Sequence, residues 1–134
     1  MVVPYTTAGN YGVLWVVVGV AARRPVRVAA TVWGTLAANY AVKLAVNRER
    51  PAPEHADPLI SLPSSSSFPS SHAAMSTAAA IVLCHQVPRL APLWIAMAAA
   101  MAASRVYVGA HYPSDVLAGA ALGSVTGTAA GALV

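Results

Sequence analysis

The sequence has little charge and almost no cysteine. Four acidic and eight basic residues make up 9% of the 134 residues, whereas 57% are hydrophobic and the mean hydropathy is +0.62. The single cysteine, Cys84, excludes an intramolecular disulfide and lies in an apolar run, so we expect a small core residue. The basic residues are too sparse for sequence-independent binding of nucleic acid. So few charges cannot keep a globule of this size soluble, and the composition indicates one integral membrane domain over residues 1–134.

Long apolar segments predict an all-α fold, a bundle of about five transmembrane helices. They cover residues 4–22, 26–46, 73–87, 91–108 and 116–134. Each has about 15 to 21 residues, compared with the roughly 20 that a helix needs to cross a bilayer, and the third is short. No alternating barrel pattern is present, and helices satisfy their own backbone hydrogen bonds. Because Arg23 and Arg24 follow the first segment rather than precede it, we expect a retained span and not a cleaved signal peptide.

The positions of the basic residues favour one orientation. Arg23, Arg24 and Arg27 lie at the connection between the first two predicted spans, and Arg89 lies between the third and fourth, so both connections are expected in the cytoplasm. The Pro/Ser-rich segment 48–71 and the stretch "SRVYVGAHYPSD", residues 104–115, then lie together at the outer face. Composition alone makes the first of these a flexible linker.

Polar residues at this outer face form three clusters. They are "KLAVNRERP" (43–51), "FPSSH" (68–72) and "SRVYVGAHYPSD" (104–115). Ionisable residues at membrane depth are costly, so their presence is a functional hypothesis, although residues 104–115 could also be a polar connector between helices.

The composition of the three clusters favours a site that binds an anion. Lys43, Arg50 and Arg105 have one nearby carboxylate, and a guanidinium group fits phosphate oxygens in a bidentate way. A helix beginning at "PSSH" adds free backbone N–H groups and the positive end of its dipole, beside the hydroxyls of Ser70 and Ser71.

Two histidines supply groups that could react with a bound phosphate. His111 and Asp115 are four residues apart, one helical turn, so the carboxylate can accept from one ring nitrogen and leave the other free as nucleophile or base. His72, on another span, can then donate a proton to the leaving oxygen. A metal site built from these three residues is the alternative, and the three cations disfavour it because they would repel a metal ion.

Other polar residues are given no direct role in this interpretation. His55 lies in the loop and His85 near a cytoplasmic end. Arg48 and Glu49 match no requirement of the site, and we expect a solvated or interfacial role for both.

At these positions the chain resembles the type 2 phosphatidic acid phosphatase superfamily, the lipid phosphate phosphatases. The family signature is Lys, six residues, Arg-Pro; then Pro-Ser-Gly-His; then Ser-Arg, five residues, His, three residues and Asp. The matching residues here are Lys43, Arg50, Pro51, Pro69, Ser70, His72, Ser104, Arg105, His111 and Asp115, with Ser71 in place of the glycine. The resemblance covers about four-fifths of the chain, from the second predicted span onward.

The resemblance implies a role for each matched residue. His111 would attack phosphorus and become a phosphohistidine, Asp115 would orient it, and His72 would protonate the leaving group, with no metal or other cofactor. The phosphate oxygens would be held by Lys43, Arg50, Ser70, Arg105 and the backbone N–H of Ser71. The Ser71 side chain could crowd the phosphate, demand a different φ or add a donor. Membrane members of the family usually have six spans, so the five predicted here indicate a minimal form or a trimmed start.

The function expected from the sequence is hydrolysis of a phosphate or diphosphate on a lipid whose tail stays in the bilayer. Candidate substrates are a polyprenyl diphosphate, phosphatidate or phosphatidylglycerophosphate, and a polyprenyl-phosphoryl sugar phosphate. The expected location is a bacterial cytoplasmic membrane with the site facing outward; the oligomeric state is left open. The alternative is a non-catalytic membrane protein that binds a lipid headgroup. A vanadate-dependent haloperoxidase is disfavoured because those enzymes are soluble and larger.

Overall fold

The computed structural model describes residues 1–51 and 59–133, and the regular structure in these ranges is helical. His55 and Val134, the last residue of the fifth predicted span, lie outside the described residues. The helices are α1 (Val2–Ala8), the short 3₁₀ helix η1 (Asn10–Gly12), α2 (Val13–Ala21), α3 (Pro25–Val46), α4 (Ser71–Gln86), the 3₁₀ helix η2 (Pro88–Leu90), α5 (Ala91–Tyr107) and α6 (Pro113–Ala132).

Four of the predicted apolar segments each coincide with one helix, from α3 to α6. The helix starts follow local chemistry. Proline occupies the first turn of α3, α5 and α6, where its missing N–H would have no helical partner. Helix α4 begins after Ser70, whose Oγ accepts a hydrogen bond from the backbone N of Ala73 at 3.4 Å.

The first predicted span, residues 4–22, is not one helix. It is divided into α1, η1 and α2 because Tyr11 (φ 52°) and Gly12 (φ 76°) adopt left-handed backbone conformations that interrupt the helical hydrogen bonds. Helix α1 lies against α5, where the hydroxyl of Tyr5 donates to the carbonyl of Met97 at 2.6 Å. Hydropathy records the apolar composition of this segment but not the change in chain direction within it.

One helix in the described part of the chain, residues 88–107, is long and apolar enough to cross a membrane by length and composition. Helix α4 has 16 residues and α2 has nine. Five membrane spans therefore stay a prediction.

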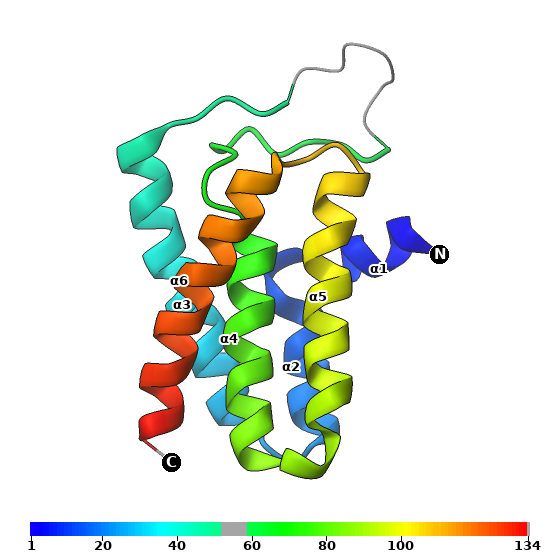
Figure 1. Cartoon of the computed structure of the whole chain (residues 1–134), viewed down its shortest axis with the longest axis vertical. Helices are drawn as coiled ribbons and strands as arrows, with labels where there is room; N and C mark the ends of the chain where they lie inside the picture. The colour runs from blue at the N-terminus through cyan, green and yellow to red at the C-terminus, as the bar shows by residue number, and fades with distance from the viewer. Residues whose placement is uncertain (52–58, 134) are drawn as a thin grey trace.

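The helices form a bundle around α4, which packs against α3, α5 and α6 (Figure 1). The connections α2–α3 and α4–α5 lie at one end, and the connections α3–α4 and α5–α6 lie at the other (Figure 1). This up-and-down arrangement brings the three polar clusters of the sequence to the same end of the bundle.

Helices α4 and α6 make an unusually close contact through glycine. The buried glycines of α6 recur at every fourth position: Gly119, Gly123, Gly127 and Gly131. A Cβ atom on Gly123 would collide with the carbonyl oxygen of Ala74, so only glycine permits this backbone approach. The approach also positions the start of α6, because the backbone N of Ser70 donates to the carbonyl of Asp115 at 2.9 Å.

Candidate active site

The three polar clusters surround a cavity of about 330 Å³ at this end of the bundle. Six of the predicted site residues line it: Lys43, Arg50, Ser71, His72, Arg105 and His111. The other two, Ser70 and Asp115, are buried and do not line it. Leu36, Tyr40 and Met75 add a less polar side to the same cavity.

The three predicted cations meet at this cavity without a carboxylate partner among the described residues. Lys43 is 4% exposed and donates to the carbonyl oxygen of Ser66. Arg50 donates to the carbonyls of Pro63 at 3.0 Å and Ala110 at 2.9 Å. Buried cations are costly unless they are paired, so this arrangement suits an anion.

Arg105 is the most deeply buried of these cations, with 1% of its surface exposed. Its Nη1 donates to the hydroxyl of Thr6 at 2.6 Å. Its Nε is buried and makes no hydrogen bond within the described part of the chain. Arg105 lines the cavity, and a guanidinium there without a carboxylate partner among the described residues is suited to an oxygen of a bound phosphate.

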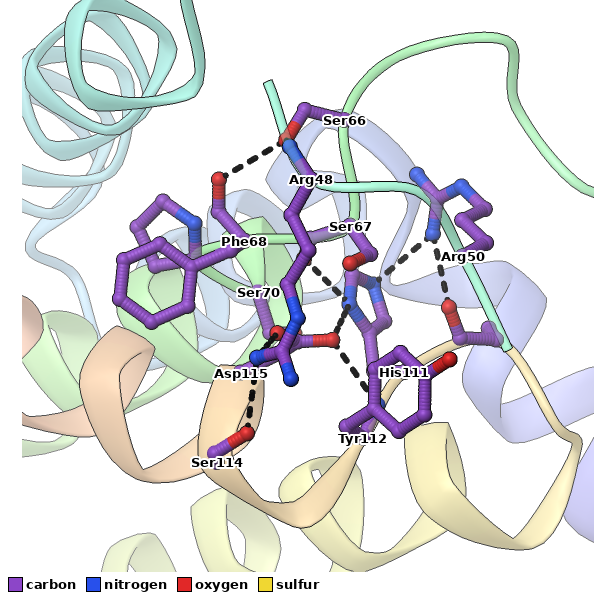
Figure 2. Close-up of polar contacts among 12 residues, drawn as sticks. Arg48, Arg50, Ser66, Ser67, Phe68, Ser70, His111, Tyr112, Ser114 and Asp115 are labelled. Atoms are coloured by element: carbon purple, nitrogen blue, oxygen red, sulfur yellow. Dashed lines mark hydrogen bonds and ion pairs between the residues drawn. The ribbon is translucent and has the colours of Figure 1, made fainter. Parts of the chain in front are cut away.

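His111 is 3% exposed, and both of its ring nitrogens have a partner (Figure 2). Nδ1 lies 2.7 Å from the carbonyl oxygen of Ser67, and Nε2 lies 3.3 Å from Nη1 of Arg50. A carbonyl oxygen can only accept, so Nδ1 carries the proton and Nε2 presents its lone pair toward Arg50.

The surroundings of His111 keep its ring neutral. Burial lowers the pKa of His111, the cations Arg50, Arg105 and Lys43 lower it further, and the hydrogen bond to the Ser67 carbonyl acts in the opposite direction. A neutral imidazole with a free lone pair is the form that can attack an electrophile.

Asp115 does not make the hydrogen bond to His111 that the sequence spacing predicts. Its Oδ2 lies 3.7 Å from Nδ1 of His111, which is an ion-pair distance but too long for a hydrogen bond. The same oxygen accepts from the backbone N of Tyr112 at 2.8 Å. The prediction assumed that both residues share a helix, whereas α6 begins at Pro113 and the carboxylate caps that helix. The orienting acceptor for His111 is the carbonyl of Ser67 instead.

Arg48, which we expected to be solvated or interfacial, is paired with Asp115. Its Nη1 donates to Asp115 Oδ1 at 3.0 Å and to the hydroxyl of Ser114 at 2.9 Å, and its guanidinium lies 4.6 Å from the centre of the Tyr112 ring. Figure 2 shows this pairing on one side of His111 and Arg50 on the other. In the sequence, only the position of Arg48 two residues before Arg50 indicated that it lies near the site.

Ser70 and Ser71 differ in their surroundings. Ser70 is the N-cap of α4, whereas Ser71 is the first residue of α4 and lines the cavity. The hydroxyl of Ser71 donates to Oδ1 of the buried Asn39 at 2.7 Å. Its backbone is helical, so this position does not require a glycine conformation. Asn39, one helical turn before Lys43, was not identified from the sequence.

His72 lines the cavity from the first turn of α4. Its Nε2 lies 3.0 Å from Oδ1 of Asn10. His85, by contrast, bonds the carbonyl of Ile81 within its own helix, at 2.8 Å. Within the described ranges, no group of three or more His, Cys, Asp or Glu side chains is arranged to hold a metal ion.

The chain is similar in sequence to known phosphatases. Over 86 residues it is 41% identical to decaprenylphosphoryl-5-phosphoribose phosphatase of Mycobacterium tuberculosis (strain H37Rv), covering 64% of this chain and 48% of that protein. Over 99 residues it is 38% identical to lipid A 1-phosphatase of Rhizobium johnstonii, covering 69% of this chain and 40% of that protein. The chain thus spans about half the length, or less, of the curated relatives it matches.

A solved structure shares the fold. It is described as the first transmembrane PAP2 type phosphatidylglycerolphosphate phosphatase, from Bacillus subtilis, and it matches with a TM-score of 0.79 at 24% identity. The match covers 98% of this chain and 74% of that one. The sequence model of the PAP2 superfamily matches residues 24–133, which include all three polar clusters. The chain therefore belongs to the PAP2 superfamily.

Proposed function

We propose that this protein is a lipid phosphatase that hydrolyses a phosphate or diphosphate without a metal ion, through a phosphohistidine on His111. The observation that carries the proposal is the cavity itself. Lys43, Arg50 and Arg105 line it without carboxylate partners among the described residues, beside the Nε2 lone pair of His111. A phosphoryl group is the anion that matches two guanidinium groups, one ammonium group and a nucleophile.

The geometry suggests the following chemistry. In the first step His111 Nε2 attacks phosphorus, and the P–O bond breaks with its electron pair moving to the leaving oxygen, which takes a proton from His72. In the second step a water molecule gives a proton to His72 and attacks phosphorus, and the P–N bond breaks with its electron pair returning to Nε2. The cations stabilise the charge that develops on the phosphoryl oxygens. Asp115, 3.7 Å from Nδ1, stabilises the positive charge on the phosphorylated ring.

The outer surface of the bundle supports a membrane location. Apolar side chains that are at least 60% exposed include Val17, Ile95, Leu117 and Val125. Such a surface is suited to lipid. We propose five spans in a bacterial cytoplasmic membrane, with Arg23, Arg24 and Arg89 at the cytoplasmic end. The site then faces outward, and the lipid tail stays in the bilayer.

The relatives direct the choice of substrate. Two of them carry names for phosphatases of lipid-linked phosphates, a decaprenylphosphoryl phosphoribose and a lipid A. We therefore propose a polyprenyl-phosphoryl sugar phosphate as the first substrate to test. A polyprenyl diphosphate, phosphatidate and phosphatidylglycerophosphate complete the panel. We propose that the protein binds its lipid substrate and lies in the bilayer, and that it does not bind nucleic acid.

The experiment is phosphate release by protein purified in detergent, measured in the presence of a chelator across this panel. We expect the wild type to release phosphate, and His111→Ala to be inactive and to form no acid-labile phosphoenzyme. Arg89→Gln, at the opposite end of the bundle, is the matched control and should retain wild-type activity. If the wild type and His111→Ala are equally inactive while both bind the lipid headgroup, the non-catalytic alternative is correct.

A further inference from the structure

The N-terminal segment, residues 1–12, reaches the cavity although it precedes the residues that match the family. Asn10 and Tyr11 line the cavity, and Thr6 contacts a residue that lines it. The left-handed backbone of Tyr11 and Gly12 turns the chain at this point. A Cβ atom on Gly12 would collide with Val32, so the turn is held close to α3.

Thr6 contacts the deepest cation of the site. It is fully buried, and its hydroxyl oxygen accepts from Arg105 Nη1 at 2.6 Å and lies 3.0 Å from the hydroxyl oxygen of Ser104. The bond to Nη1 holds one end of the guanidinium, whose Nε makes no hydrogen bond within the described residues.

Asn10 contacts the proposed acid. Its Oδ1 lies 3.0 Å from His72 Nε2, and a Cβ atom on the neighbouring Gly9 would lie 2.9 Å from Cδ2 of the same ring. One edge of the imidazole therefore lies against the N-terminal segment. Because an amide oxygen can only accept, this hydrogen bond requires a proton on Nε2.

We propose that Asn10 and Thr6 are positioning residues of the phosphatase site, acting through His72 and Arg105. Asn10 keeps a proton on Nε2 throughout. The bound phosphate anion stabilises the imidazolium form of His72, whose Nδ1 gives its proton to the leaving oxygen as the P–O bond breaks and regains one from water in the hydrolysis step. Thr6 holds the guanidinium of Arg105 in place at the cavity wall, where Arg105 binds a phosphate oxygen. This inference rests on the proposed function.

The test for Asn10 compares two leaving groups. An alkyl lipid phosphate needs a proton on its leaving oxygen, whereas p-nitrophenyl phosphate releases a stable phenolate without one. We expect Asn10→Ala to lower kcat about tenfold or more on the lipid phosphate, a part of what a positioned acid supplies. On the aryl phosphate the loss should be less than about threefold, because little acid catalysis is needed there.

Four further variants distinguish positioning from folding. His72→Ala should show the same dependence on the leaving group, and the double variant Asn10→Ala/His72→Ala should be no worse than His72→Ala alone. Asn10→Asp retains an oxygen acceptor and should recover activity on the lipid phosphate. Tyr5→Phe removes a hydrogen bond from the same segment and should leave the ratio of the two activities unchanged. Equal losses on both substrates, or additive losses in the double variant, would overturn the proposal for Asn10.

The test for Thr6 measures inhibition by inorganic phosphate. Thr6→Val should raise the inhibition constant about tenfold or more, as expected for loss of a hydrogen bond to a charged group, and Thr6→Ser should restore it. The role of Thr6 is overturned if Thr6→Val binds phosphate normally or if Thr6→Ser is equally impaired. A wild type that is inactive on both substrates would refute the proposed function itself, and that result needs no variant.

Discussion

The neutral ring of His111 determines how activity should depend on pH. Catalysis needs the uncharged imidazole, so activity is present above the pKa of His111 and is lost as the pH falls through it. Burial and then Arg50 lower this pKa below the ordinary value of about 6.5, so the acid limb of kcat/KM should lie below that value.

Arg50→Gln should move the acid limb to higher pH because one of the causes of the lowered pKa is removed. The overall rate will also fall, since Arg50 is a proposed phosphate ligand. The measurement is therefore the pH at which kcat/KM falls on the acid side. Ionisation of the substrate affects the wild type and the variant equally, so it does not account for a shift between them. A limb that stays in place, or moves to lower pH, would contradict this account of His111.

Ser71→Gly should retain activity within about threefold, because the hydroxyl is donated to Asn39 and is not needed as a phosphate donor. Steady-state kinetics and the inhibition constant for phosphate check this. Loss of more than about tenfold would show that the hydroxyl contacts the phosphate instead.

Arg48→Met should lower kcat by about fivefold, the rate equivalent of one partly exposed ion pair of ~1 kcal/mol. Asp115 would lose the partner at 3.0 Å and become less well placed beside His111. Arg48→Lys retains the charge but loses the planar group that lies over Tyr112, so partial recovery is expected. Equal rates for Arg48→Met and the wild type would exclude this role.

Single residues were predictable where the signature fixes their spacing. Lys43, Arg50, Arg105, His72 and His111 meet at one cavity as expected. The hydrogen-bond partners could not be predicted in the same way. Any residue can offer the carbonyl that holds His111, so the role of the Ser67 carbonyl leaves no mark in the sequence.

At the scale of helices, the contact between α4 and α6 controls the shape of the site. Gly123→Ala should lower the free energy of unfolding of the protein in detergent by about 1–3 kcal/mol, because the new Cβ would collide with the carbonyl of Ala74. Gly34→Ala is the matched control, since a Cβ there meets no atom within 4 Å and alanine favours a helix. Thermal unfolding of both variants checks this, and similar shifts would contradict the steric explanation.

Helices were predictable where an apolar run continues without a change of direction. The break at residues 9–12 was not, because left-handed dihedrals at Tyr11 and Gly12 do not alter hydropathy. The Pro/Ser composition of the long connection indicated a flexible linker. Its described part instead supplies carbonyl acceptors to the site, an effect of backbone contacts that composition does not encode.

For the whole molecule, the two ends of the bundle should lie on opposite sides of the membrane. In a Cys84→Ser background, Ser64→Cys lies at the cavity and Arg89→Cys lies at the far end. A membrane-impermeant maleimide should label the first in intact cells, and the second only after permeabilisation. The opposite pattern would reverse the proposed orientation.

The carbonyl contacts of residues 63–67 also bear on how this protein can vary. Lys43, Arg50 and His111 are held by the main chain at Ser66, Pro63 and Ser67. A substitution in this stretch leaves these carbonyls in place, although the hydroxyls of Ser65 and Ser67 also bond Arg50 and the carbonyl of Glu49. An insertion or deletion would shift every carbonyl acceptor out of register. In an alignment of the family, we therefore expect the length of this loop to be more strongly conserved than the identity of its residues.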